Sequence, residues 1–223
     1  MAVNKEQYFK IAGELKQKEV TLVSVSKTKP VEDILELYQL GQRDFGENYV
    51  QELVDKEAQL PKDIRWHFIG HLQSNKVKNI APFVHLIHGV DSFKLLKEIN
   101  KQAQKLNRIM DVLLQVHIAQ EETKFGLSGD ELNDIFNTNA ELHKLQNIRI
   151  TGLMGMASFT DDENKIREEF HYLKTLFDKH TQLQTSNLKL QILSMGMSSD
   201  YKIAIEEGST MVRIGSLLFG ARS

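Results

Sequence analysis

The feature that most constrains the fold is an alternation of strand patterns and helix patterns along the whole chain. Short runs of β-branched and aromatic residues are followed by helical stripes, with short connections between them. Eight strands are predicted, over residues 21–25, 43–45, 65–70, 83–88, 111–118, 148–154, 188–193 and 210–214. Strands that alternate with helices in this way indicate parallel βαβ units, which can close into a barrel.

Helical segments fill the intervals between these strands, and one more, over residues 5–18, precedes the first strand. Two helix starts have the spacing of a capping box, Ser128 with Glu131 and Thr160 with Glu163. The other helices are predicted near residues 34–40, 48–59, 74–80, 92–106 and 199–207, with a last turn at 216–221.

The fold prediction is α/β, a single TIM-type (β/α)8 barrel over residues 1–223 with residues 5–18 as an additional N-terminal helix. A doubly wound open sheet is the structural alternative. That sheet normally has a glycine-rich first turn, whereas the first turn here reads Lys-Thr-Lys-Pro. The barrel is therefore preferred.

Composition narrows the class of protein. The 223 residues carry a net charge of −2 without a long basic run, so the sequence has no electrostatic pattern for nucleic acid or anionic membrane. There is no cysteine, which excludes disulfides, thiolate nucleophiles and cysteine-based zinc sites. The start of the chain lacks a signal-peptide pattern. We expect a cytoplasmic globular protein.

Lys27 follows the first predicted strand and precedes Pro30, where the strand has to stop because proline has no N–H to donate. On a period of two, Lys27 shares a face with Val23 and Val25. A partly desolvated lysine on a rigid element loses proton affinity, which suits attack on an aldehyde and formation of a Schiff base. A strand-end lysine that reaches out to water is the ordinary alternative.

Two loops at the expected phosphate position of a barrel, after strands seven and eight, are rich in serine and glycine. They contain Ser194, Gly196, Met197, Ser198, Gly215 and Ser216. Free backbone N–H groups there can hold an anion, although serines at helix starts are commonly only caps. Arg213 shares a face with Met211 and is predicted to point into the barrel mouth.

The histidines do not indicate a metal site. His67 and His71 have the spacing of a helical zinc pair, but they lie in or beside a predicted strand, which breaks that geometry. His85 and His88 fall on opposite faces of their strand. No metal is predicted.

Five motifs in order resemble the pyridoxal phosphate homeostasis proteins, and the match spans nearly the whole chain. The motifs are Ser26–Pro30, Phe45–Tyr49, Trp66–Lys76, Leu193–Ser198 and Val212–Gly220. The resemblance implies a barrel like the N-terminal domain of alanine racemase (PLP fold type III) without the C-terminal β domain, binding pyridoxal 5′-phosphate (PLP).

The resemblance also implies roles for residues. Lys27 would carry PLP as a Schiff base, and Arg213 would face the pyridine nitrogen. Asn48 would line the site, and Lys124 would be a loop lysine near the pocket that assists PLP handling. Ser194, Gly196, Met197, Ser198, Gly215 and Ser216 would hold the phosphate. His117 departs from the family, which often has asparagine there, and that puts the pocket wall at this point in question.

The function that this resemblance implies is a monomeric, non-catalytic carrier or regulator of PLP, which serves vitamin B6 and amino-acid homeostasis and can pass PLP to apoenzymes. Arginine cannot supply a proton acceptor, so it disfavours a protonated ring nitrogen and weakens the ring as an electron sink. One alternative is a PLP-dependent racemase or lyase of low activity. Another is an unrelated barrel enzyme that acts on a phosphorylated metabolite.

Overall fold

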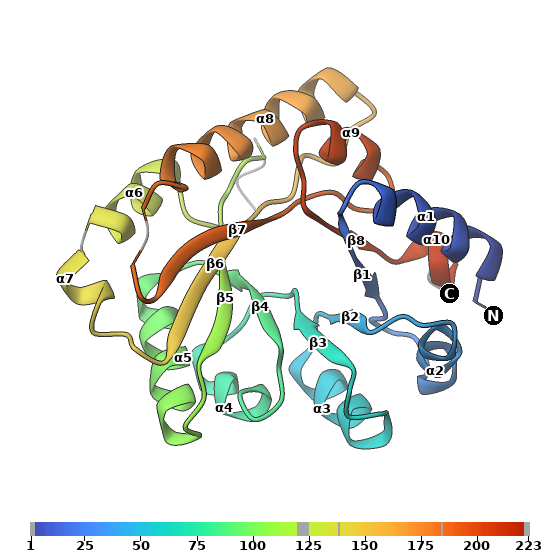
Figure 1. Ribbon diagram of the computed structural model, residues 1–223, viewed down its shortest axis with the longest axis horizontal. Coiled ribbons are helices and arrows are strands. Elements are labelled where there is room, and N and C mark those ends of the chain that lie inside the picture. The colour runs from blue at the N-terminus through green and yellow to red at the C-terminus, as the bar shows by residue number, and fades with distance from the viewer. Residues whose placement is uncertain (1–2, 120–124, 138, 184, 221–223) are drawn as a thin grey trace.

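Eight parallel strands close into a barrel in chain order, with β8 pairing back onto β1 (Figure 1). This computed structural model describes residues 3–119, 125–137, 139–183 and 185–220. The closed barrel confirms the predicted fold and excludes the open sheet. The strands are β1 (Thr21–Val25), β2 (Asp44–Glu47), β3 (Arg65–Phe68), β4 (Leu86–Val90), β5 (Met110–Gln115), β6 (Ile148–Met154), β7 (Leu188–Ser194) and β8 (Met211–Ile214).

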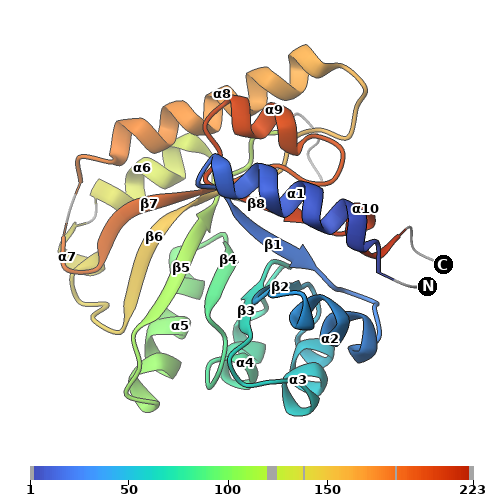
Figure 2. The same cartoon turned by 45° about the vertical axis from the view of Figure 1, so that its right-hand side comes forward.

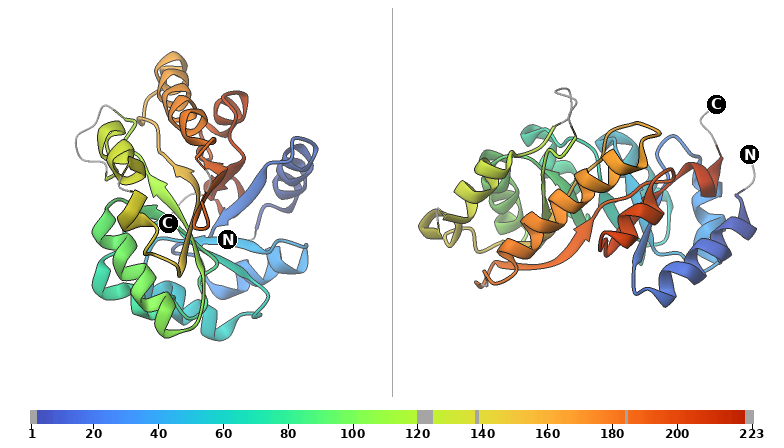
Figure 3. Two further views of the ribbon diagram at one scale, coloured as in Figure 1. Left: turned by 60° about the vertical axis from the view of Figure 1, so that its left-hand side comes forward. Right: turned by 90° about the horizontal axis from the view of Figure 1, so that it is seen from above.

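Helices surround the strands (Figure 3). The first helix lies beside the last one in the views of Figures 1 and 2, and the Asn4 N–H donates to the Leu218 carbonyl at 2.8 Å. The helical elements are α1 (Lys5–Gln17), α2 (Val31–Gln39), α3 (Val50–Gln59), the 3₁₀ turn η1 (Ser74–Lys76), α4 (Val77–Ile80), α5 (Phe93–Lys105), α6 (Gly129–Asn137), α7 (Asn139–Leu142), α8 (Glu163–His180), α9 (Tyr201–Glu206) and α10 (Ser216–Phe219).

Two clusters of buried hydrophobic side chains stabilise the fold. The large one fills the space between helices and barrel, and includes fully buried side chains such as Phe45, Phe170 and Leu53. The small one, inside the barrel, consists of Val23, Leu86, Leu113, Met154 and Met211. Because successive side chains of a strand point to opposite sides, β1, β4, β5, β6 and β8 each supply side chains to both clusters.

Some local predictions were wrong. The fourth strand begins at Leu86 and not at Phe83, because the preceding residues close the end of α4, where the Val84 N–H donates to the Ile80 carbonyl at 2.9 Å. Helix α8 is capped by Asp162 and not by Thr160: its carboxylate accepts the N–H groups of the second and third helical residues, at 3.0 and 3.3 Å.

The other predicted capping box is present. The Ser128 hydroxyl accepts the Glu131 N–H at 3.1 Å, and the Glu131 carboxylate accepts the Ser128 N–H at 2.8 Å. The helix predicted from this start corresponds to α6 and α7, which lie on either side of residue 138, a position outside the described residues. Within the described residues, no helix is both long enough and apolar enough to cross a membrane.

Candidate functional site

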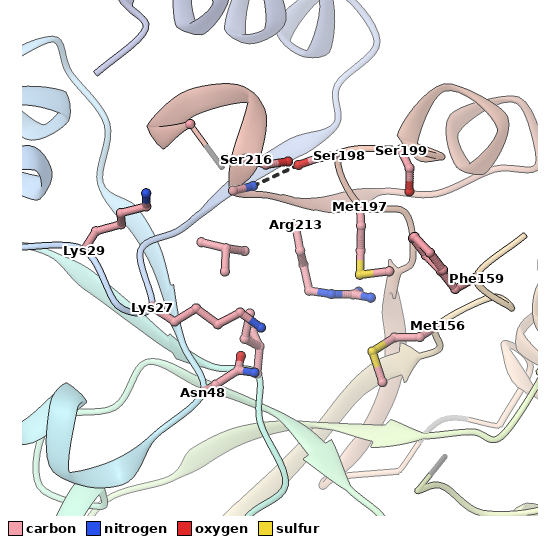
Figure 4. Close-up of a pocket in the computed structure, with 14 residues that line it drawn as sticks. Lys27, Lys29, Asn48, Met156, Phe159, Met197, Ser198, Ser199, Arg213 and Ser216 are labelled. Carbon is pink, nitrogen blue, oxygen red and sulfur yellow. Dashed lines mark hydrogen bonds between the residues drawn. The ribbon is translucent and has the colours of Figure 1, made fainter. Parts of the chain in front are cut away.

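A cavity of about 400 Å³ opens at the carboxyl ends of the strands (Figure 4). Its size lies in the range of roughly 300–1,000 Å³ typical of small-molecule sites. The wall combines apolar side chains with two lysines, one arginine and several hydroxyl groups. It is lined by Val25, Lys27, Lys29, Asn48, Ile69, Met156, Phe159, Met197, Ser198, Ser199, Arg213, Gly215, Ser216 and Gly220.

Lys27 lies two residues beyond the end of β1, in a turn, and its side chain is of intermediate exposure. It extends into the cavity below Arg213, as Figure 4 shows. Lys29 occupies the edge of the cavity, and its ammonium donates to the Phe219 carbonyl at 2.9 Å. The two lysines of the motif therefore have different surroundings, and Lys27 is the one that enters the cavity.

The turn that carries Lys27 is held from both sides. Thr28 has a left-handed backbone with φ of 63°, which is costly for a β-branched residue. Its N–H donates to the Glu52 carboxylate at 2.6 Å. On the other side, the Ser26 N–H donates to the Gly46 carbonyl at 3.0 Å. These bonds keep the strained turn, and hence Lys27, in place.

A buried ion cluster lies beneath this turn. The Lys56 ammonium donates to the Ser26 carbonyl at 2.7 Å, to Glu47 Oε1 at 2.8 Å and to Glu52 Oε1 at 2.6 Å. The Ser26 hydroxyl also donates to Glu47 Oε1 at 2.6 Å. Burial raises the pKa of Glu47, and the charge and hydrogen bond of Lys56 oppose that rise. A single cation thus joins the turn to both carboxylates.

The loop after β7 reaches the cavity through a glycine that no other residue can replace without strain. Gly196 has φ of 96°, and a Cβ there would lie 2.6 Å from Ala204 Cβ. The Met197 N–H donates to Asp200 Oδ1 at 2.5 Å. The Gly215 N–H, in the loop after β8, donates to the Ser198 hydroxyl at 3.2 Å (Figure 4). The two loops are thereby joined at the cavity wall.

Arg213 is almost fully buried, with 4% of its surface exposed. Its guanidinium donates to the Ser194 hydroxyl at 2.6 Å and to the Gly155 carbonyl at 3.0 Å. Burial lowers the pKa of Arg213 to about 10, against the opposing influence of the Asp200 charge. The guanidinium is therefore a fixed donor at the base of the cavity.

Most of the predicted site residues meet in this cavity. Its lining includes Lys27, Asn48, Met197, Ser198, Arg213, Gly215 and Ser216. Ser194 and Gly196 do not line it: Ser194 is fully buried inside the barrel against Arg213, and Gly196 shapes the loop. Lys124 lies outside the described residues. His117 is not among the lining residues, and its N–H donates to the Leu127 carbonyl at 2.9 Å.

Several lining residues were not predicted. Ile69 and Met156 follow β3 and β6, so their position at the carboxyl end of a strand was the available signal. Phe159 lines the mouth and is 92% exposed. In the described residues, no group of three or more histidine, aspartate or glutamate side chains is arranged to hold a metal ion.

Several curated proteins that are similar in sequence to this chain are named pyridoxal phosphate homeostasis protein. The family described as alanine racemase, N-terminal domain, matches residues 6–223. The pyridoxal phosphate homeostasis protein of Aquifex aeolicus is 45% identical over 203 residues, which cover 90% of this chain and 86% of the relative. The protein of the same name from Escherichia coli K12 is 39% identical over 208 residues, 92% and 86% of the two chains.

Two solved structures resemble this chain in fold. PipY of Synechococcus elongatus, with PLP bound, superposes with a TM-score of 0.86 at 36% identity, covering 96% of this chain and 99% of PipY. The alanine racemase of Clostridium difficile superposes with a TM-score of 0.75 at 15% identity, and the match covers 99% of this chain but 58% of the racemase. That second likeness concerns the fold alone.

The fold and the cavity define a barrel of the alanine racemase N-terminal-domain class. Within that class, the chain belongs to the family of the pyridoxal phosphate homeostasis proteins. The resemblance inferred from the five sequence motifs is thereby confirmed.

The residues of the cavity fit PLP chemically. PLP presents an aldehyde, a flat aromatic ring with a nitrogen, and a phosphate. The cavity supplies an amine in Lys27, apolar surfaces in Val25 and Ile69, and a guanidinium donor in Arg213. Hydroxyl groups follow β7 and β8, where barrels of this kind commonly bind phosphate.

Proposed function

We propose that this protein binds PLP in the cavity, attached to Lys27 as a Schiff base, and acts in PLP and amino-acid homeostasis. The observation that carries the proposal is the placement of Lys27. Its amine enters a 400 Å³ cavity that also contains a buried guanidinium and the hydroxyl-rich loops after β7 and β8. The homologous names and the PLP-bound structure of PipY support the same ligand.

Within this proposal each group has one task. Lys27 would hold PLP through its side-chain amine. Arg213 would face the ring nitrogen, and Asn48 and Met197 would line the cavity around the ligand. Ser198, Ser216 and the backbone at Gly215 would form the phosphate side, and Gly196 would shape the loop that carries Ser198. When bound, PLP supplies an electron sink for amino-acid chemistry, and a donor at the ring nitrogen weakens that capacity.

We further propose that the protein is a carrier or regulator and has no catalytic turnover. Among the described lining residues, Lys27 and Lys29 are the ones that can exchange a proton as an amine, and Lys29 is engaged by the Phe219 carbonyl. Racemisation needs a proton donor and acceptor on each face of the substrate, so these two lysines favour a PLP-binding protein over a racemase. A racemase or lyase of low activity is the alternative, and assays of amino-acid racemisation and elimination with the loaded protein distinguish the two.

PLP-dependent apoenzymes are the proposed recipients. Phe159 stands at the mouth of the cavity with most of its surface exposed, so the cavity opens to the protein surface, where a recipient could approach. Incubation of the loaded protein with an apoenzyme, followed by assay of the recovered enzyme, tests transfer. The cytoplasmic location, the monomeric state and a role for Lys124 stay predictions from the sequence.

The decisive experiment compares two lysines of the same motif. Wild-type protein mixed with PLP should show the absorbance band of an imine, and borohydride should fix the label on Lys27 in a peptide map. Lys27→Ala should abolish the band while the circular dichroism stays that of a folded barrel. Lys29→Ala is the matched control and should retain the band. A label on any residue other than Lys27 would overturn the proposal.

A further inference from the structure

A chain of hydrogen bonds crosses the interior of the barrel and ends at Arg213. The Arg213 guanidinium contacts the Ser194 hydroxyl at 2.6 Å, and that hydroxyl lies 3.2 Å from His88 Nδ1. His88 Nε2 is 2.9 Å from His67 Nδ1, and His67 Nε2 is 3.0 Å from Asp44 Oδ1. The five residues come from β8, β7, β4, β3 and β2.

This chain is inaccessible to solvent over most of its length. Ser194 and His88 are completely buried, and His67 is 1% exposed. Polar groups in such a place are costly unless each has a partner, and here each ring nitrogen has one. The interior of the barrel therefore holds this polar chain in addition to the small apolar cluster.

When both imidazole rings are neutral, Asp44 at one end of the chain fixes the direction of every bond in it, because a carboxylate can only accept. Arg213 can only donate, so the Ser194 oxygen accepts from it, and the hydroxyl proton is left for the unprotonated Nδ1 of His88. His88 therefore carries its proton on Nε2 and donates to His67 Nδ1. His67 in turn carries its proton on Nε2 and donates to Asp44, which can only accept as a carboxylate.

The electrostatics agree with this direction. Burial lowers the pKa of His88 well below its usual range, and the nearby positive charge of Arg213 acts in the same sense, so His88 is neutral. Burial alone would raise the pKa of Asp44, but the hydrogen bonds from His67 and Arg65 lower it to about 2. Asp44 is thus ionised at neutral pH and remains an acceptor.

We propose that His88 and His67, acting through Ser194, are positioning residues that fix the Arg213 guanidinium at the base of the cavity. The inference rests on the proposed function in one respect, that Arg213 faces the bound ring. It also reassigns Ser194, whose hydroxyl is used in orienting Arg213 and does not reach the phosphate side. A pocket whose ring-facing arginine is held in this way has its donor in place before the ligand arrives.

The direction of the chain is tested in the protein without ligand. Nitrogen-15 NMR of histidine-labelled protein distinguishes the two neutral tautomers, and His88→Phe and His67→Phe assign the signals. The proposal expects both residues as neutral Nε2–H tautomers at pH 7. An Nδ1–H tautomer or a charged imidazolium at His88 would overturn it, because the Ser194 hydroxyl could not then donate to that ring.

The effect on the site is tested with Ser194→Ala, His88→Phe and the double variant. Loss of the hydrogen bond to Arg213 should weaken PLP binding about three- to tenfold in Ser194→Ala. The absorbance maximum of bound PLP should shift as well, which a purely structural defect would not cause. Because the residues act as one chain, the double variant should lose little more than one single variant.

His143→Phe provides the control, since His143 is exposed and outside the chain. Thermal unfolding of each variant checks that the barrel persists, and Ser194→Ala, the smaller change, keeps the test available if His88→Phe fails to fold. Unchanged PLP affinity and absorbance in Ser194→Ala would refute the positioning role. Failure of wild-type protein to bind PLP would refute the proposed function. The tautomer experiment would still test the direction of the hydrogen bonds between Arg213 and Asp44.

Discussion

Lys56 is the cation that ties the Lys27 turn to the barrel, and Lys56→Met removes its charge with little change in volume. Its side chain is 7% exposed, and that of its partner Glu47 is fully buried. Glu47 Oε2 has no hydrogen-bond partner in the described residues, so its charge depends on the bonds to Oε1 from Lys56 and Ser26. The substitution leaves this carboxylate buried beside Glu52 without a cation.

Removing one member of a buried ion pair costs about 3–5 kcal/mol of the free energy of unfolding. The three hydrogen bonds donated by the Lys56 ammonium place this case in that range. Two of these acceptors fix the residues on either side of Lys27. One is the carbonyl of Ser26 itself, and the other is the Glu52 carboxylate, which accepts the Thr28 N–H. We therefore expect weaker PLP binding along with the loss of stability.

The assay is urea unfolding followed by circular dichroism, with two comparisons. Lys62→Met removes a cation from the pair with Glu57, but the Lys62 side chain is 65% exposed, so the expected loss is below about 1 kcal/mol. The double variant Lys56→Met with Glu47→Gln should recover much of the stability, since the uncompensated charge is gone.

The pH dependence of the stability of Lys56→Met provides the result that could refute this reasoning. Without Lys56, the pKa of Glu47 rises further, so the folded protein holds this proton to a higher pH than the unfolded chain, whose Glu titrates near pKa 4.3. Stability of the variant then falls as pH rises through that window, and its deficit is smallest in acid. A loss below 1 kcal/mol at pH 7, or a deficit that grows on acidification, would contradict the burial argument.

Two further predictions concern backbone geometry and acid stability. Gly196→Ala should destabilise the protein by about 1–3 kcal/mol and weaken PLP binding, because φ is 96° and the new Cβ would meet Ala204. Gly13→Ala, in α1 with open space around it, should stabilise by about 0.5–1 kcal/mol, and denaturant titration checks both. In the folded protein the pKa of Asp44 is about 2, below that of an unfolded aspartate. The ionised carboxylate therefore contributes its full share to the free energy of unfolding above about pH 4, and this contribution is lost as pH falls toward 2. Asp44→Asn should flatten this part of the stability–pH curve, and an unchanged acid slope would contradict the assignment.

Local sequence signals located the strands and helices well where turn chemistry was clear. The Ser128 capping box was found where it was predicted. Thr160 failed as a cap because Asp162, two residues later, offers a stronger acceptor to the same helix start. The fourth strand was placed too early because Phe83 and Val84 have strand propensity, whereas their N–H groups donate to the Ile80 carbonyl and close the end of α4.

The cavity was predictable in outline because the carboxyl ends of all strands of a parallel barrel lie at one end. That rule placed Lys27 and Arg213 together from the sequence. It did not separate residues that line the cavity from those one layer below it, and so Ser194 was grouped with the phosphate loops.

The sequence by itself determined the order of strands and helices, the parallel barrel and the end at which its chemistry lies, because periodicity, caps and turns are local properties. The tertiary structure alone decided which polar groups meet. Ser194 and His88 are 106 residues apart and share a hydrogen bond, and Lys56 reaches Ser26 across 30 residues. Such partners depend on strand register in the closed barrel, and register is set by the packing of all eight strands together.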